Sequence, residues 1–128
     1  MNKVVLSLGS NSSNCQEMMV NCIEWLSTIV SNLKTSHSYF TEALNGKDKD
    51  YINAVAEGYV YVDYDKLKQQ VKQYELSMGR TPESKKKGII PIDIDIVIWN
   101  EEIIKETDYN QSYFQIGFTA LNVIKNGK

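Results

Sequence analysis

The chain lacks several features that mark membrane and secreted proteins. Its 128 residues contain no apolar run near the ~20 residues of a membrane-spanning helix, and no signal-peptide pattern at the N-terminus. The two cysteines, Cys15 and Cys22, fall in one predicted helix at a separation of ~10.5 Å along its axis, beyond disulfide reach. The net charge of −2 argues against broad binding to nucleic acid or membrane surfaces. We therefore expect a cytoplasmic protein with reduced thiols that binds neither nucleic acid nor membranes.

Common nucleotide-binding motifs are also absent. Neither G-x-x-x-x-G-K-[ST] nor G-x-G-x-x-G occurs, which disfavours a P-loop or a Rossmann enzyme. The single histidine, His37, lies in a predicted strand without a metal-ligand pattern, and we interpret it as structural. Because the net charge is slightly negative, an anionic ligand would need a local basic cluster. The sequence has one, formed by Arg80, Lys85, Lys86 and Lys87.

The spacing of apolar residues predicts a single domain with the order β-α-β-β-α-β. Strands are expected at residues 4–8, 34–40, 51–61 and 91–99, and helices at 15–31 and from 63 or 65 to 79. Asn14 and Glu17 resemble a capping box for the first helix. The order is typical of the α+β ferredoxin-like fold, with an antiparallel sheet and both helices on one face. Beyond Asn100 we expect a short C-terminal extension, in which a turn is followed by YFQIGFTALNVI (113–124), an irregular segment that could lead into a brief helix. Loops and ligand would then cover the other face of the sheet.

Residues 91–99, PIDIDIVIW, place two aspartates inside an apolar strand. Because side chains alternate along a strand, Asp93 and Asp95 share one face, and the isoleucines beside them would face the helices. Two carboxylates ~7 Å apart along a strand can bind divalent cations that also bind phosphate oxygens. A solvent-facing pair is the simpler interpretation of a generic D-x-D. The apolar flanks, the basic loop before them and an expected central place in the sheet favour the metal site.

The basic loop between Gly79 and Gly88 leads directly into that strand. Phosphoryl transfer depends on metal ions and Arg or Lys side chains that position phosphates and neutralise charge, so the loop could close over a polyphosphate. Each lysine could equally be a solvated surface residue, and Arg80 could complement the dipole at the helix C-terminus. Glu75 could accept a hydrogen bond from a ribose or orient Arg80, or it could be a plain surface residue.

Four segments occur in an order and spacing that are specific in combination. They are VVLSLGSN (4–11), DYINAV (50–55), YELSMGR (74–80) and PIDIDIVIW (91–99). In this combination the chain resembles the 6-hydroxymethyl-7,8-dihydropterin pyrophosphokinases of folate biosynthesis. The resemblance implies an ATP-dependent diphosphotransferase with one pyrophosphokinase-like domain spanning residues 1–128, acting as a monomer. It would transfer the β,γ-diphosphate of ATP to the hydroxymethyl group of the pterin and release AMP.

The resemblance also implies a role for individual residues. Asp93 and Asp95 would bind two Mg²⁺ ions that bridge the ATP phosphates and, with Arg80, form the catalytic centre. Glu75 and Arg80 match nucleotide-side positions, where Lys85, Lys86 and Lys87 could add positive charge. The positions that contact the pterin match Thr41, Leu44, Tyr51, Asn53 and Phe118, the last an aromatic residue that stacks on the ring.

The chain departs from the family pattern at several functional positions. Three arginines of the family pattern are replaced here, by Pro82, Ile90 and Ile116. A tryptophan of the pattern is replaced by Lys87, and a histidine by Asn110. Loss of a charge-stabilising donor typically costs ~10²–10³ in rate, and lysine does not reproduce the bidentate clamp of arginine. Three hypotheses stay open: an active divergent enzyme, a non-catalytic relative that binds pterin or nucleotide, and a ferredoxin-like interaction module. The intact aspartate pair favours the first.

Overall fold

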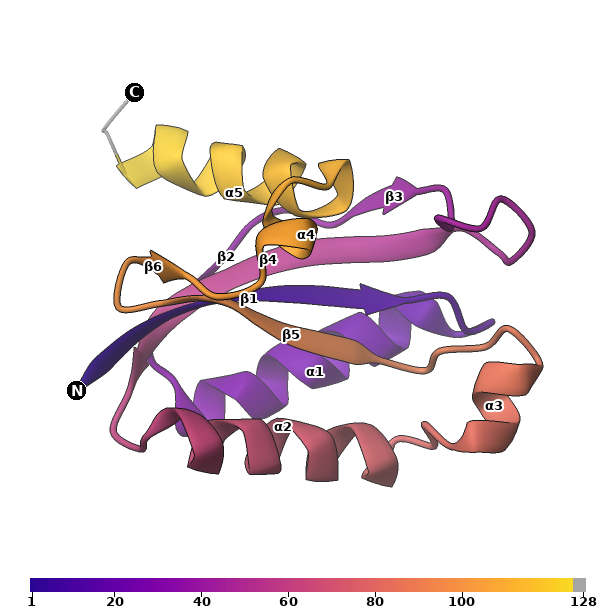
Figure 1. Cartoon of the computed structure of the whole chain (residues 1–128), viewed down its shortest axis with the longest axis horizontal. Helices are drawn as coiled ribbons and strands as arrows, with labels where there is room; N and C mark the ends of the chain where they lie inside the picture. Colours follow the sequence, from indigo (N-terminus) through magenta and orange to yellow (C-terminus); the bar gives the residue numbers. More distant parts are fainter. Residues whose placement is uncertain (126–128) are drawn as a thin grey trace.

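The computed structural model describes residues 1–125, with side chains as far as residue 122. One antiparallel sheet lies between two layers of helices (Figure 1). The elements are β1 (Asn2–Ser10), α1 (Cys15–Ile29), β2 (Ser31–Thr35), β3 (Tyr39–Thr41), β4 (Tyr51–Val60), α2 (Tyr64–Ser77), α3 (Pro82–Lys86), β5 (Asp93–Trp99), β6 (Glu102–Ile103), α4 (Glu106–Tyr109) and α5 (Ser112–Lys125). No helix among these residues is both long and apolar enough to cross a membrane.

The sheet has the strand order β2-β4-β1-β5-β6, and β3 pairs with the other end of β4. Every pairing is antiparallel, which confirms an α+β protein with an antiparallel sheet. Strand β5 lies beside β1, but within the described residues β6 pairs only with Ile98 and Trp99. The half of β5 that carries the aspartates is therefore a sheet edge. Although β5 lies between β1 and β6 in the strand order, the expectation of a central strand is wrong for this half.

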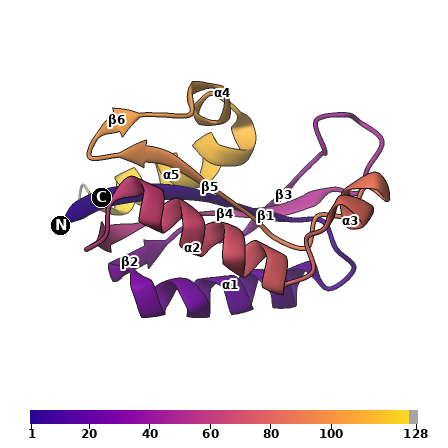
Figure 2. The same ribbon diagram turned by 60° about the horizontal axis from the view of Figure 1, so that its bottom comes forward.

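Helices α1 and α2 cover one face of the sheet (Figure 2). Their buried residues, Met18, Met19, Cys22, Leu26, Leu67, Val71 and Tyr74, pack on inward-facing residues of the strands. Ile92, Ile94 and Ile96 belong to this core, as the alternation predicts. Trp25 and Tyr74 join the two helices by stacking, with ring centroids 4.3 Å apart.

The opposite face is covered by α5, which lies on the other side of the sheet from α1 and α2 (Figures 1 and 2). Phe114 and Leu121 of α5 pack on Val5, Val55 and Val97 of three strands. A helix is present in this segment, as expected, but it is not brief and no irregular segment opens it: α5 begins at Ser112 and has 14 residues. Loops and ligand can cover only the part of this face that α5 leaves open.

Local details also differ from the sequence-based expectations. Asn14 makes no capping hydrogen bond to α1, and its side-chain oxygen instead accepts a bond from the Ser12 hydroxyl at 2.6 Å. The predicted second strand is split into β2 and β3, because Ser36 between them pairs with Val55 through both backbone and hydroxyl. Part of the basic loop is α3, which starts with a capping box between Thr81 and Ser84.

Candidate functional site

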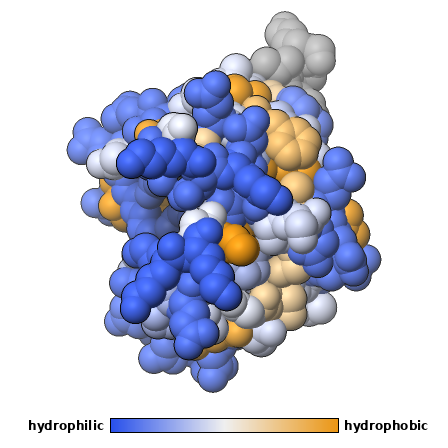
Figure 3. Space-filling view, turned by 90° about the vertical axis from the view of Figure 1, so that its right-hand side faces the viewer, coloured by the Kyte–Doolittle hydropathy of each residue, from blue (hydrophilic) through white to orange (hydrophobic). Residues whose placement is uncertain are grey.

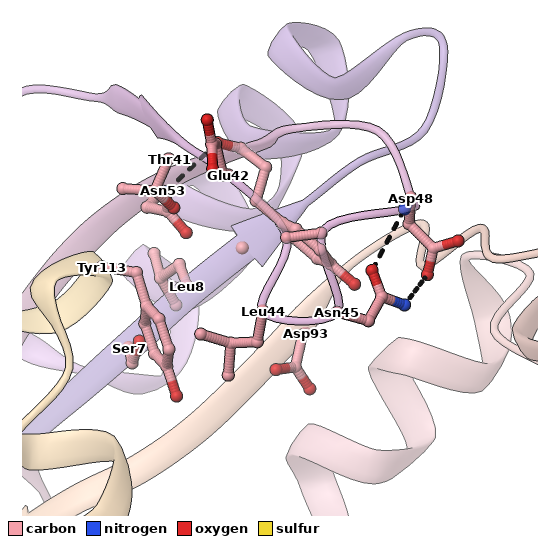
Figure 4. Close-up of a pocket in the computed structure, with 13 residues that line it drawn as sticks. Ser7, Leu8, Thr41, Glu42, Leu44, Asn45, Asp48, Asn53, Asp93 and Tyr113 are labelled. Atoms are coloured by element: carbon pink, nitrogen blue, oxygen red, sulfur yellow. Dashed lines mark hydrogen bonds between the residues drawn. The ribbon is translucent and has the colours of Figure 1, made fainter.

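Two hollows meet at the aspartate end of β5. The larger pocket has a volume of about 310 Å³ and lies under the loop of residues 42–50 (Figure 4). Its lining includes Ser7, Leu8, Gly9, Thr41, Leu44, Asn45, Asp48, Tyr51, Asn53, Asp93 and Tyr113. The second, which we call the α2–β5 hollow, has a volume of about 170 Å³. Its lining includes Tyr64, Lys68, Lys72, Glu75, Arg80, Asp93, Asp95 and Lys105. Asp93 lines both.

Asn53 organises the floor of the larger pocket. Its side-chain nitrogen donates to the Thr41 hydroxyl at 2.8 Å and to the carbonyl oxygens of Tyr51 and Tyr39 at 3.1 and 3.3 Å. These three acceptors fix the orientation of the amide, so its oxygen has a defined direction. The structure thus brings Thr41, Tyr51 and Asn53 together, which are three of the residues to which the family resemblance gives a pterin contact.

The loop of residues 42–50 forms the outer wall of the larger pocket. Asn45 stabilises the turn in this loop. Its side-chain nitrogen donates to the Asp48 carboxylate, and its side-chain oxygen accepts hydrogen bonds from the backbone N–H groups of Lys47 and Asp48. Leu44 is 73% exposed at the rim. Asp48 packs so closely on Gly88 that a Cβ there would lie 2.8 Å from the Asp48 Cγ. At this end of the molecule the surface is mainly hydrophilic around an apolar patch (Figure 3).

Tyr113 forms a wall of the larger pocket that the sequence did not reveal. Its hydroxyl donates a short hydrogen bond to the Asp108 carboxylate. The Tyr39 hydroxyl donates to the Tyr113 carbonyl oxygen at 2.6 Å and accepts from the Gly117 N–H at 3.0 Å. The Tyr39 hydroxyl thereby bridges the Tyr113 carbonyl oxygen and the Gly117 N–H, two groups four residues apart that bond directly to each other in a regular α-helix. The Tyr113 ring is therefore positioned by β3 as well as by its own helix.

Phe118 does not line the larger pocket. Its ring stacks on Phe114 with centroids 5.1 Å apart and also contacts Tyr109. It lines another hollow, beside Val5 and Ile98, under α5. The structure therefore does not bring Phe118 together with Thr41 and the other predicted pterin residues, and its stacking role stays a prediction.

Arg80 and Glu75 hold the beginning of β5. Arg80 forms a short ion pair with Asp93, and it also lies 3.1 Å from a Glu75 carboxylate oxygen. The same Glu75 oxygen accepts a hydrogen bond from the Ile94 N–H at 2.8 Å. Burial lowers the pKa of Arg80, but the bond to Asp93 and the nearby carboxylates outweigh this and raise it. The Glu75 side chain is therefore not a plain surface residue, and its contact with Arg80 agrees with the alternative in which it orients Arg80.

Asp95 pairs with Lys105, a residue that the sequence did not single out. The Lys105 ammonium lies 2.7 Å from the Asp95 carboxylate, and the two side chains are 39% and 21% exposed. Burial raises the pKa of Asp95 to about 6, and the negative charge of Asp93 adds to this effect, while Lys105 opposes it. The two carboxylates thus share one face, as predicted, and each has a cationic partner.

A hairpin delivers Lys105 to this position. Asn100 and Glu101 turn the chain with φ of 50° and 70°, and β6 then runs back along β5. The Ile104 and Lys105 N–H groups donate to the Val97 carbonyl oxygen at 2.9 and 3.4 Å. Val97 follows Asp95 by two residues, which places Lys105 alongside the aspartates. The asparagine at the turn was the available sequence signal.

The predicted lysine cluster lies elsewhere. Lys85 and Lys86 are exposed on α3, and Lys87 is exposed at its C-terminus. Within the part of the chain described, they do not line the larger pocket or the α2–β5 hollow. The hollow instead receives Lys68 and Lys72, one turn apart on α2, together with Lys105. Nucleotide binding by the α3 lysines stays a prediction.

The residues that depart from the family pattern lie in different settings, and only that of Pro82 accounts for the residue type. Pro82 is at the first turn of α3, where its missing N–H costs no helical bond. Ile90 donates its N–H to the Asn11 side chain at 2.6 Å, and Asn11 also donates to the Gly88 carbonyl oxygen at 2.8 Å. Asn110 is exposed after α4, where its side chain donates to the Glu106 carbonyl oxygen. Ile116 is an exposed residue of α5.

The two aspartates fit a metal that arrives with a phosphorylated ligand. The described residues contain no group of three or more His, Cys, Asp or Glu side chains that could hold a metal alone. Mg²⁺ usually keeps several waters and is bound by one or two carboxylates together with substrate phosphates. Asp93 and Asp95 supply the carboxylates, and the hollow beside them has room and positive charge for phosphates.

Comparison with known proteins agrees with these features. The model of the 7,8-dihydro-6-hydroxymethylpterin-pyrophosphokinase (HPPK) family matches residues 5–122. The match includes all the residues named above as lining the larger pocket and the α2–β5 hollow. No curated protein matches the chain significantly.

Proposed function

Because the chain belongs to the 7,8-dihydro-6-hydroxymethylpterin-pyrophosphokinase family, we propose that it makes AMP and a pterin diphosphate from ATP and 6-hydroxymethyl-7,8-dihydropterin. The family uses ATP and Mg²⁺ in folate biosynthesis. The observation that carries the proposal is that Asp93 lines both the larger pocket and the α2–β5 hollow. A carboxylate at the junction of two hollows suits the transfer of a diphosphate from a nucleotide in one to an acceptor in the other.

The larger pocket supports the binding of the pterin. The fixed amide oxygen of Asn53 can accept a hydrogen bond from the amino-substituted edge of the ring, and the Thr41 hydroxyl lies beside it. Tyr51, Leu44 and Tyr113 offer aromatic or apolar surface for the faces of the ring. In this orientation the hydroxymethyl group would point toward Asp93.

The α2–β5 hollow supports the binding of the ATP phosphates. The hydroxymethyl oxygen would lose its proton to solvent and attack the β-phosphorus, the bond from that phosphorus to the bridging oxygen of the α-phosphate would break, and AMP would leave with that oxygen. Arg80 would neutralise charge on the phosphates once a ligand draws it from Asp93. Two Mg²⁺ ions held by Asp93 and Asp95 would supply Lewis-acid neutralisation of the transferred diphosphate.

The proposal extends to the fold, the cellular compartment and the oligomeric state. The β-α-β-β-α-β connectivity and the order β2-β4-β1-β5 support a ferredoxin-like domain that spans the chain. Both cysteines are free, and burial raises the pKa of Cys22 to about 12, which disfavours its thiolate. Free thiols support a protein of the reducing cytoplasm. We propose in addition that it acts as a monomer.

A second candidate function is that of a catalytically weak or inactive relative that binds pterin or nucleotide. The isoleucines at positions 90 and 116 favour it, because neither provides the charge that the family pattern has there. A ferredoxin-like interaction module is a weaker alternative, because it does not explain why paired carboxylates lie between two hollows.

One assay separates these functions. The protein is incubated with ATP, Mg²⁺ and the reduced hydroxymethylpterin, and AMP is measured, beside Asp95→Ala and the control Asp65→Ala at an exposed position of α2. We expect AMP from the wild type and the control, and a loss of at least ~10²-fold in Asp95→Ala. Saturable binding of pterin or ATP without AMP would establish the second function. No binding of either would leave the interaction module.

A further inference from the structure

We propose that Lys105 is an exchangeable cation of this site. The Lys105 ammonium neutralises Asp95 while no metal is bound. When a divalent cation binds Asp95 instead, the ammonium moves to a phosphate of the nucleotide. The first half concerns Asp95 and the metal alone, and the second half rests on the proposed function. Nothing in the family comparison assigns a role to this residue.

The pairing of Asp95 places Lys105 in competition with a metal. Its ammonium lies 2.7 Å from one carboxylate oxygen of Asp95, and Asp93 is engaged in the same way by Arg80. A divalent cation that binds these oxygens would bring further positive charge within a few ångströms of the ammonium. Like charges at that distance repel strongly in a half-buried site, so the ammonium must leave as the metal enters.

The structure gives the displaced ammonium a place to go. The backbone of Lys105 is fixed by its hydrogen bond to the Val97 carbonyl oxygen and by the start of α4, so the side chain alone would move. A lysine stem has four flexible carbons, and this one is partly exposed. It already lines the α2–β5 hollow together with Lys68, Lys72 and Arg80.

That hollow then holds four cationic side chains and a metal against three carboxylates, those of Glu75, Asp93 and Asp95, and the net positive charge that remains favours an anion. A polyphosphate has the charge and the acceptor oxygens to balance it. Lys105 would thus provide, from a position after β6, positive charge that the isoleucines at positions 90 and 116 do not provide. Lys105 would therefore pair with Asp95 in the metal-free protein and with a phosphate in the protein that holds metal and nucleotide.

Exchange predicts effects of opposite sign on two affinities. In Lys105→Met, Mn²⁺ alone should bind Asp93 and Asp95 more tightly, by about fivefold or more, because the competing ammonium is gone. In the presence of saturating Mg²⁺, an ATP analogue should bind more weakly, by about tenfold or more, because a charged phosphate contact is lost. A merely structural role would move both affinities in one direction or leave both unchanged.

The experiment uses the full chain as wild type, Lys105→Met, Lys105→Arg and the control Lys66→Met, an exposed residue of α2 that lines neither described hollow. Mn²⁺ binding without nucleotide is followed by electron paramagnetic resonance, and binding of α,β-methylene-ATP with Mg²⁺ is followed by calorimetry. We expect opposite shifts in Lys105→Met, wild-type-like values in Lys66→Met, and retention of most nucleotide affinity in Lys105→Arg.

Parallel shifts, no shift in either affinity, or a wild type that binds no Mn²⁺ would each overturn the exchange. Failure of the proposed function would look different. Opposite shifts in a protein that forms no AMP would overturn the diphosphate transfer and leave the exchange standing. Circular dichroism of Lys105→Met checks that the variant is folded before either affinity is compared.

Discussion

Glu75 accepts a hydrogen bond from the backbone N–H of Ile94 at 2.8 Å, so a carboxylate of α2 satisfies a donor on the edge of β5. This N–H lies between the two aspartates of the strand. An edge strand without a partner leaves such donors open. Glu75 also contacts Arg80, so one side chain sets both the position of the strand and the direction of the guanidinium.

Glu75→Ala should therefore destabilise the protein. It leaves the Ile94 N–H without this acceptor and Arg80 without one of its carboxylates, which should lower the free energy of unfolding by about 1–3 kcal/mol. Glu75→Gln should cost less, because it keeps an acceptor for Ile94. Urea unfolding measures both, with Glu24→Ala at an exposed position of α1 as the control. Equal costs for Glu75→Ala and Glu24→Ala would refute the role of Glu75.

Asp95 should make the folded state less stable as the pH rises from 4 to 7. Its folded pKa of about 6 is above the ordinary 3.8, so in this range the folded protein holds a proton that the unfolded chain has lost. The free energy of unfolding then falls with rising pH. Asp95→Asn removes the titrating group and serves as the reference. In metal-free buffer, the stability of the wild type minus that of the variant should fall by roughly 1–3 kcal/mol. A flat or rising difference would contradict the raised pKa.

Asn53→Ala should weaken pterin binding and leave nucleotide binding nearly unchanged. The variant removes the fixed amide oxygen and releases the Thr41 hydroxyl, so we expect about tenfold lower pterin affinity or more. Calorimetry with the pterin and with α,β-methylene-ATP gives both values. Asn21→Ala, exposed on α1, is the matched control. A similar loss in both affinities would mean that Asn53 supports the fold rather than the pocket.

Gly117→Ala should be overpacked. A Cβ at this position would lie 2.7 Å from a Val55 methyl carbon and 2.8 Å from the hydroxyl oxygens of Ser36 and Tyr39. We expect a loss of about 1–3 kcal/mol in the free energy of unfolding, measured in urea. Thr119→Ala, at an exposed position of the same helix, should change it by less than about 0.5 kcal/mol. A variant as stable as the wild type would show that α5 does not need this close approach.

Much of the fold could be predicted because its signals are local. Alternation in the last predicted strand places Ile94 in the helix-covered core and Asp93 and Asp95 on the other face, and all three lie as expected. The ranges of α1 and α2 follow from apolar spacing, and Asp63 caps α2 as one of the two expected alternatives. Thr41, Tyr51 and Asn53 meet because β3 and β4 pair in register.

The parts that could not be predicted depend on contacts between distant segments. Lys105 reaches Asp95 only because a hairpin reverses the chain after Trp99, and no apolar period marks that return. Phe118 was expected in the pocket, but it follows Tyr113 by five residues, which is about 140° around a helix. When Tyr113 faces the pocket, Phe118 must face elsewhere. The α3 lysines point to solvent because a short capped helix replaces the expected open loop.

The Tyr39 hydroxyl that bridges Tyr113 and Gly117 has a consequence for the thermodynamics of binding. It connects two walls of the larger pocket, β3 and α5, so these walls are preorganised before a ligand arrives. Little conformational entropy remains for them to lose on binding. The ordering cost should then fall on the exposed loop of residues 42–50, whose length and sequence become the means of tuning affinity without altering the groups that recognise the ligand.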